Sequence, residues 1–129
     1  MVRLSTRELV RTRAGYRCEY CQLHEDDDVY VFHVEHVIAT KHGGSDSEDN
    51  LALACHQCNL HKGPNLSGLD PDSGQMVALF HPRKQKWEEH FRRVSSRIEG
   101  ITSVGRTTAF VLCMNDSDRV EARRLIGFQ

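Results

Sequence analysis

The chain has 129 residues, the usual size of one domain that can bury a modest core. Its 17 lysines and arginines are balanced by 18 aspartates and glutamates, so net charge alone gives no support to binding of a polyanion. No apolar run approaches the ~20 residues of a membrane-spanning helix, and the first residues lack the apolar segment of a signal peptide. These features predict a soluble, cytoplasmic protein.

The first two predicted elements are a helix and a strand. Ser5 and Glu8 have the spacing of a capping box, which predicts a helix from Ser5 to about Gly15. Residues 29–34 are rich in β-branched and aromatic side chains and predict a strand that ends at Glu35-His36. Adjacent residues of a regular strand point to opposite faces, so this pair can share one site only where the strand ends or bends.

A loop, a second strand and a short helix follow. Residues 40–50 contain Gly43-Gly44 and several serine, aspartate and asparagine residues, which is typical of a loop. Residues 51–54 predict the return strand. Residues 57–62 predict a short helix, which Gly63-Pro64 would end.

The rest of the chain predicts further short elements, and the fold class is therefore α+β. A turn sequence at residues 70–74 leads into an expected strand, and Trp87, Phe91 and Val94 recur at helical spacing. In chain order we predict a strand at 76–80, a helix at 83–94, a strand at 98–102, and helices at 107–114 and 117–126.

Two Cys-x-x-Cys pairs predict a metal site. Each pair presents two sulfur atoms to one ion, and two pairs complete the tetrahedral Cys₄ shell that structural zinc prefers. Such a closed shell has no position for water, so this ion would be structural rather than catalytic. Redox-active cysteines are the alternative, which the doubled spacing disfavours. The pairs are Cys18 with Cys21 and Cys55 with Cys58, whereas Cys113 lies in an apolar run and is expected to be a small buried residue.

The segment between and just after the pairs contains residues suited to phosphodiester hydrolysis. This reaction needs a base that deprotonates water, a cation near the phosphate and stabilisation of the leaving oxygen. His36 can act as the base because neutral imidazole is available near pH 7. Glu35 offers a hard carboxylate oxygen, which suits Mg²⁺ or Mn²⁺.

From Cys18 to about Gly63 the sequence resembles the zinc-bracketed type of the HNH endonuclease family, which has a ββα-metal fold. Four stretches carry the resemblance: Val34–Ile38, His42–Gly44, Asn50-Leu51 and Cys58–Gly63. They correspond to the acid-histidine strand end, the glycine loop, the middle asparagine and the closing helix of the family.

The resemblance implies a role for each of these motif residues. His36 would be the general base, and Glu35 and Asn59 would bind the catalytic Mg²⁺ or Mn²⁺ ion. Asn50 would lock the loop and orient His36, and Lys62 would face the phosphate.

The chain departs from the family at two positions, and other histidines offer alternatives. Glu35 stands where aspartate is more frequent, and Asn59 stands where the bacteriocin nucleases have histidine, with His61 as a rival ligand. His33 is either a supporting or third ligand or a structural residue. The same choice between a role at the site and a structural role applies to His42, His81 and His90.

Together these features predict a metal-dependent HNH endonuclease that cleaves DNA, with double-stranded DNA as its partner. The alternative is a catalytically inactive zinc-knuckle module that binds DNA or protein. A module of that kind has no use for an acid, a histidine and an asparagine in this order. We expect one domain over residues 1–129: an N-terminal helix (1–17), a zinc-bracketed core (18–66) and an accessory hairpin with helices (67–129).

Positive charge is clustered in two segments. Residues 3–17 contain five arginines opposed only by Glu8, and residues 83–97 contain six basic residues. Such clusters are often solvated faces, but phosphate contacts also depend on them. In a nuclease they should form one basic surface that flanks His36.

Overall fold

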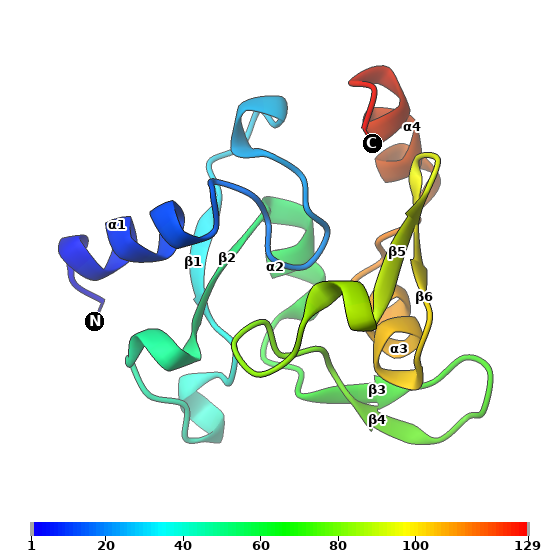
Figure 1. Ribbon diagram of the computed structural model, residues 1–129. Coiled ribbons are helices and arrows are strands. Elements are labelled where there is room, and N and C mark those ends of the chain that lie inside the picture. The colour runs from blue at the N-terminus through cyan, green and yellow to red at the C-terminus, as the bar shows by residue number, and fades with distance from the viewer. Residues whose placement is uncertain (1, 129) are drawn as a thin grey trace.

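The computed structural model describes residues 2–128, which form helices and small antiparallel sheets of an α+β fold (Figure 1). Each of the three sheets in this part of the chain has two strands. The elements are α1 (Leu4–Arg13), β1 (His33–His36), β2 (Leu51–Ala54), α2 (His56–Lys62), β3 (Ser67–Leu69), β4 (Met76–Ala78), β5 (Phe91–Val94), β6 (Arg97–Gly100), α3 (Ser103–Val111) and α4 (Ser117–Leu125).

The ββα unit consists of β1, β2 and α2. The two strands pair from His33 opposite Ala54 to His36 opposite Leu51. All four residues of β2 are buried, because α1 contacts both strands on one side and α2 follows directly on the other. The predicted return strand and the predicted short helix before Gly63 are confirmed.

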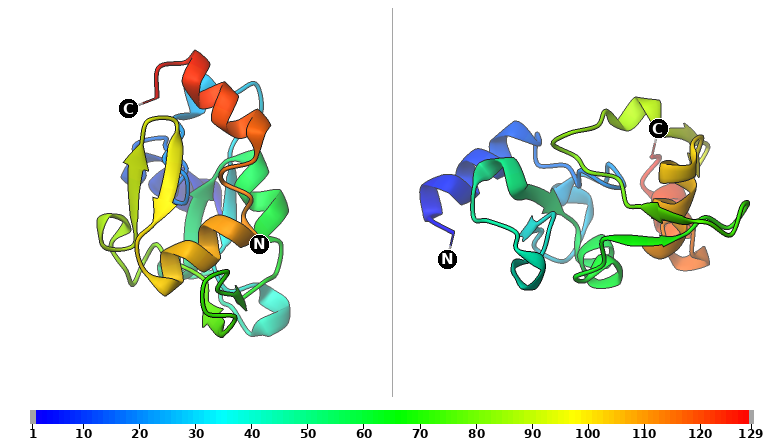
Figure 2. Two further views of the ribbon diagram at one scale, coloured as in Figure 1. Left: turned by 90° about the vertical axis from the view of Figure 1, so that its right-hand side faces the viewer. Right: turned by 90° about the horizontal axis from the view of Figure 1, so that it is seen from below.

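The second half of the chain forms two hairpins that pack on α3. The hairpins are β3–β4 and β5–β6, and α3 contacts β3, β4 and β6. Figure 1 and the right view of Figure 2 show the ββα unit between α1 and this second half. No helix among residues 2–128 is long and apolar enough to cross a membrane.

An aromatic cluster joins the two halves. The Phe80 ring meets those of Tyr20 and Phe91 edge-on, with centroids 6.5 and 5.2 Å away, and the Trp87 ring stacks on Phe91. The indole of Trp87 also donates a hydrogen bond of 2.8 Å to the carbonyl of Tyr20. Tyr20 lies inside the first cysteine pair, so the cluster holds that pair against the second half of the chain.

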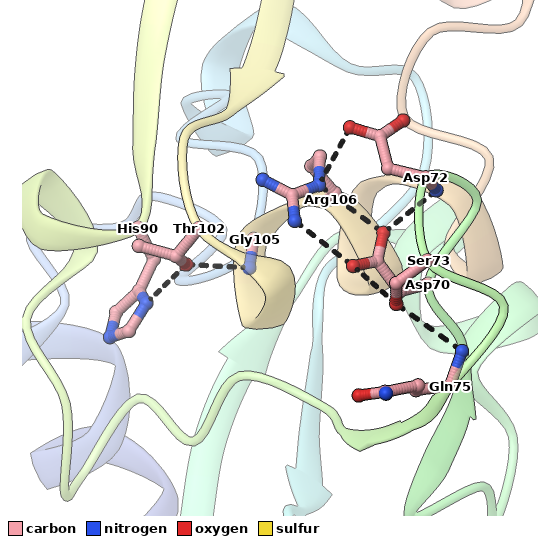
Figure 3. A network of polar contacts seen from close by, with 8 residues as sticks. All are labelled: Asp70, Asp72, Ser73, Gln75, His90, Thr102, Gly105 and Arg106. Atoms are coloured by element: carbon pink, nitrogen blue, oxygen red, sulfur yellow. Dashed lines mark hydrogen bonds and ion pairs between the residues drawn. The ribbon is translucent and has the colours of Figure 1, made fainter.

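Asp70 organises the turn between β3 and β4 and ties it to α3 (Figure 3). Its carboxylate accepts hydrogen bonds from the guanidinium of Arg106, at 3.0 and 3.2 Å, and from the hydroxyl of Ser73 at 3.1 Å. Arg106 also pairs with Asp72. The Arg106 guanidinium, the amide of Asp72 and the Ser73 hydroxyl lower the pKa of Asp70 to about 2, so the carboxylate is charged at neutral pH.

Two expectations for the first part of the chain are wrong. The Ser5–Glu8 capping box does not form, because the helix begins at Leu4 and Glu8 contacts Thr12 and Tyr16 instead. The first strand does not begin at Val29, which is 92% exposed. Pairing with the four residues of β2 restricts β1 to His33–His36.

The expected helix at 83–94 is replaced by a short 3₁₀ turn and by β5. The apolar residues at helical spacing serve another purpose, since Trp87 and Phe91 stack on each other across a turn. Arg92 faces Glu99 on β6, and their side chains form an ion pair of 2.9 Å. Cross-strand pairing with a distant segment therefore overrides the local helical pattern.

Close approach of α3 to β5 predicts that Gly105 cannot be enlarged. A Cβ atom at Gly105 would lie 1.9 Å from the carbonyl oxygen of His90. We expect Gly105→Ala to lower the free energy of unfolding by about 1–3 kcal/mol, as overpacking does. Denaturant unfolding measures the change, and Ser103→Ala on the same helix is the control. Equal stability of Gly105→Ala and the wild-type protein would contradict the packing of α3.

Candidate nuclease site

The two cysteine pairs meet in one buried cluster. The sulfur atoms of Cys18, Cys21, Cys55 and Cys58 all lie within 4.8 Å of one another, and all four residues are buried. The amides of Cys21 and Cys58 each donate a hydrogen bond of 3.4 Å to the first sulfur of their pair. Burial raises the pKa of Cys18 and Cys58, so a bound cation is needed to stabilise four thiolates here. The cluster fits a structural zinc ion.

Arg119 on α4 supports this cluster from outside. Its guanidinium lies 3.0 Å from the sulfur of Cys58 and 3.8 Å from that of Cys55. Burial lowers the pKa of Arg119, but the nearby cysteine thiolates more than offset this effect and the net shift is upward. A zinc ion with four thiolates has an excess negative charge, which Arg119 partly neutralises. The sequence contains no local signal for this contact, since Arg119 and Cys58 are far apart along the chain.

The strand β1 and the helix α2 border an open depression of about 410 Å³. Its walls include His33, Glu35, His36 and Asn59. The structure therefore brings the predicted base and both predicted ligands of the divalent ion to one surface feature.

Glu35 is the buried acidic group of the depression. One carboxylate oxygen, Oε2, lies 3.5 Å from the ammonium of Lys62, whereas Oε1 has no hydrogen-bond partner among residues 2–128. Burial raises the pKa of Glu35, although the charge of Lys62 opposes this shift. The buried hydroxyl of Tyr20 also lacks a hydrogen-bond partner among residues 2–128, and it lies near this carboxylate. Burial raises the pKa of Tyr20 and the Glu35 carboxylate raises it further, whereas Tyr20 lowers the pKa of Glu35. A buried carboxylate oxygen without a partner fits a hard divalent cation.

Lys62 does not occupy the expected position facing a phosphate. Its side chain is only 2% exposed, and its ammonium donates a hydrogen bond of 2.8 Å to the carbonyl of Val37. The contact with Glu35 accounts for this burial, because a buried charge needs a partner of opposite sign.

His36 lies at the end of β1 and contacts a residue that the sequence motifs did not indicate. Its Nε2 atom is 2.7 Å from Oδ1 of Asp46, in the loop after Gly44. This contact leaves Nδ1 as the other functional nitrogen of the ring. No spacing rule singled out Asp46, because the contact depends on how the loop folds back.

Asn50 holds that loop in place. Its side-chain oxygen accepts a hydrogen bond of 2.9 Å from the amide of Ile38, and its Nδ2 donates to the carbonyls of Ile38 and Ser45. The loop passes so close that a Cβ atom at Gly44 would lie 1.7 Å from the Ile38 oxygen. Only glycine fits at this position, which gives a physical reason for the glycine loop.

The other histidines lie in different surroundings. His33 belongs to an exposed aromatic group beside the depression, in which Tyr30 stacks on His56 at 4.5 Å and His33 lies 5.8 Å from His56. His90 contacts the hydroxyl of Thr102, the N-cap of α3 (Figure 3). His42 is exposed, His81 lines a separate pocket beside Val37, and His61 lies near Cys113 and Asp116.

The two basic segments approach each other away from the depression, since Arg13 and Arg17 line a pocket with Pro82, Gln85 and Trp87. Figure 1 and the right view of Figure 2 show α1 and β5 on opposite sides of the ββα unit. In the second segment, Arg92 pairs with Glu99 and Arg93 lies over the ring of Phe128. In the first, Arg3 and Arg7 are exposed. The depression that contains His36 is lined by no residue of either segment, so a basic surface that flanks His36 stays a prediction.

Residues 18–65 match the family described as HNH endonuclease, so the match covers this segment and not the whole chain. Over 119 residues, which are 86% of this chain, the sequence is 28% identical to the Septu protein PtuB of Bacillus thuringiensis. The aligned part is 42% of that protein, so the chain spans less than half the length of this relative. No solved structure matches the chain.

The contact of Arg119 with the cysteine cluster predicts a role in zinc retention. Replacing Arg119 by methionine removes the charge and the hydrogen bonds but keeps much of the apolar stem. We expect zinc affinity to fall about 10–100-fold, as is typical when a supporting partner of a metal ligand is removed. Competition with a chromophoric chelator measures the affinity.

Arg124→Met is the matched control for this experiment. Arg124 lies on the same helix but pairs only with the exposed Glu121. Zinc affinity of this variant should equal that of the wild-type protein. If both variants bind zinc as the wild-type protein does, the contact of Arg119 has no influence on the metal.

Proposed function

We propose that the chain is a metal-dependent HNH endonuclease that hydrolyses phosphodiester bonds of DNA. The observation that carries this proposal is the unpaired, buried oxygen of Glu35 in a depression that His36 and Asn59 also line. Glu35 and Asn59 would hold one Mg²⁺ or Mn²⁺ ion through oxygen atoms. Residues 1–129 act as a single unit in this proposal, with the nuclease core at 18–66.

His36 is the general base. In this proposal Asp46 accepts a hydrogen bond from the Nε2–H group and so fixes the tautomer in which Nδ1 has a free lone pair. Nδ1 takes a proton from a water molecule, which attacks phosphorus in line with the leaving 3′ oxygen. The products are a 5′-phosphate and a 3′-hydroxyl. Asp46 acts through His36 and is a positioning residue.

The divalent ion, when bound, supplies charge stabilisation at the phosphate and at the leaving oxygen. Lys62 prepares its site: burial raises the pKa of Glu35, and the ammonium opposes this rise and so favours the charged carboxylate. This role replaces the phosphate contact that the family resemblance implies for Lys62.

Double-stranded DNA is the substrate in this proposal, and two exposed features can contact it. Arg3 and Arg7 of the α1 region are exposed and can neutralise phosphates. The exposed aromatic group of Tyr30, His33 and His56 offers flat surfaces against which the nucleic acid can lie.

Removal of the imidazole tests the proposed base. His36→Ala should lower the rate of plasmid nicking in Mg²⁺ or Mn²⁺ by ~10²–10⁴-fold, the usual effect of losing a general base. Zinc content should stay unchanged, because His36 is not part of the cysteine cluster.

The matched control is His42→Ala, which removes an exposed imidazole six residues further along the chain, in the loop after β1. It should cleave as the wild-type protein does. Equal activity of His36→Ala and the wild-type protein would refute the assignment of the base. No cleavage by the wild-type protein with any divalent ion, at full zinc content, would instead favour a binding module.

A second variant tests the ligand of the catalytic ion. Glu35→Gln keeps the shape of the side chain but removes its charge, so a higher Mn²⁺ concentration should be needed for half-maximal cleavage. Titration of activity against Mn²⁺ measures this change. Glu48→Gln, at an exposed glutamate just before β2, is the control. An unchanged Mn²⁺ requirement in Glu35→Gln would exclude Glu35 as a ligand.

A further inference from the structure

The helix α2 presents metal-binding residues on two different faces. Cys55, Cys58 and His61 follow one another at steps of three residues, so they lie along one side of the helix. Asn59 instead lines the depression beside β1. His61 therefore lies away from the proposed catalytic ion and is not its alternative ligand.

The segment that faces His61 is the turn between α3 and α4. In this turn Leu112 and Met114 are fully buried, whereas Cys113 between them is partly exposed. The expectation that Cys113 is simply a buried apolar residue is thus wrong. Its backbone has a φ of 53°, in the left-handed region that residues with a side chain rarely adopt.

Polar contacts on three sides hold this turn in its conformation. Arg119 donates hydrogen bonds to the carbonyls of Leu112 and Cys113, at 2.7 and 3.2 Å. Asn115 exchanges two hydrogen bonds with the backbone of Ile98, and Arg123 donates to the carbonyl of Met114. The Cys113 side chain is therefore presented by a well-supported backbone, as a metal ligand requires.

Three donor atoms converge at this point. Ligand atoms of His61, Cys113 and Asp116 all lie within 4.8 Å of one another. Asp116 occupies the N-cap position of α4 but makes no capping hydrogen bond with its side chain. Among residues 2–128, neither the His61 imidazole nor the Asp116 carboxylate has a hydrogen-bond partner. Asp116 is exposed and His61 is partly exposed, so an ion can reach these donor atoms and the cysteine sulfur from solvent.

We propose that His61, Cys113 and Asp116 form a second metal site, which binds Zn²⁺. Nitrogen, sulfur and carboxylate oxygen are the three ligand types of protein zinc sites. In a tetrahedral shell with bonds of about 2.0–2.3 Å, ligand atoms lie roughly 3.3–3.8 Å apart, so small side-chain movements close the site. The fourth position is open to water or to a small external ligand. Binding releases the thiol proton of Cys113 to solvent.

This site would link the nuclease core to the second half of the chain. His61 belongs to the ββα unit, whereas Cys113 and Asp116 belong to the α3–α4 turn. Arg119 connects the two metal sites, since one of its nitrogens contacts the sulfur of Cys58 and the other the carbonyl of Cys113. The second ion would therefore stabilise the docking of α4 that brings Arg119 to the cysteine cluster.

Zinc stoichiometry tests the proposal with Zn²⁺ alone as the probe. The full chain is dialysed against micromolar free Zn²⁺, and metal is measured by elemental analysis. We expect about two zinc ions per chain in the wild-type protein and about one in His61→Ala and in Asp116→Asn. Asp118→Asn and His42→Ala are the matched controls, at exposed residues outside the cluster, and should keep both ions.

Substitution with Co²⁺ identifies the ligand. The wild-type protein should show more sulfur-to-cobalt absorption than Cys113→Ala, with the difference matching one thiolate. One zinc ion per wild-type chain would overturn the proposal, as would two ions that persist in all three variants. These results are separate from those on cleavage, because neither His61 nor Cys113 lines the depression that contains His36.

Discussion

The meeting of two distant cysteine pairs at one buried point is the constraint on which the rest of this structure depends. It joins residues 18–21 to residues 55–58 and so closes the chain segment that contains β1, the glycine loop and β2. Closing a long loop has an entropic cost that a few hydrogen bonds do not offset. A zinc ion bound by four thiolates contributes on the order of 10 kcal/mol in small domains, which is enough. Cys55 is also the N-cap of α2, so the same cluster sets where that helix begins.

Charge burial links this scaffold to the depression. Glu35 lies beneath the surface, where an unpaired carboxylate would be costly, and the ammonium of Lys62 reduces that cost. Lys62 engages only one of the two carboxylate oxygens. The ion pair can therefore remain buried, while the second carboxylate oxygen can still bind a cation. The nuclease proposal depends on this balance.

The second half of the chain contributes by contact rather than by motif. The aromatic cluster around Phe80 supports the first cysteine pair, and Arg119 supports the second pair from α4. The α3–α4 turn, where Cys113 and Asp116 approach His61, lies directly beside this arginine. Segments outside the HNH match thus complete the environment of the metal-binding residues within it.

The sequence by itself determined the features that follow from local rules. The spacing of the cysteine pairs predicts their cluster, because each pair acts through a single turn. The strand at 51–54 and the helix before Gly63 are encoded by neighbouring residues, and both are confirmed. The positions of His36, Asn50 and Asn59 around one loop and one helix follow from the order of these elements.

Only the tertiary structure decided which distant groups meet. Pairing of β5 with β6 converted a helical pattern into a strand, since hydrogen bonds to another segment outweigh the spacing of Trp87 and Phe91. Burial turned Lys62 from an expected phosphate contact into the partner of Glu35. The contacts of Asp46 with His36 and of Arg119 with Cys58 have no local signature. Each depends on how the backbone folds back on itself, and that geometry is a property of the whole chain.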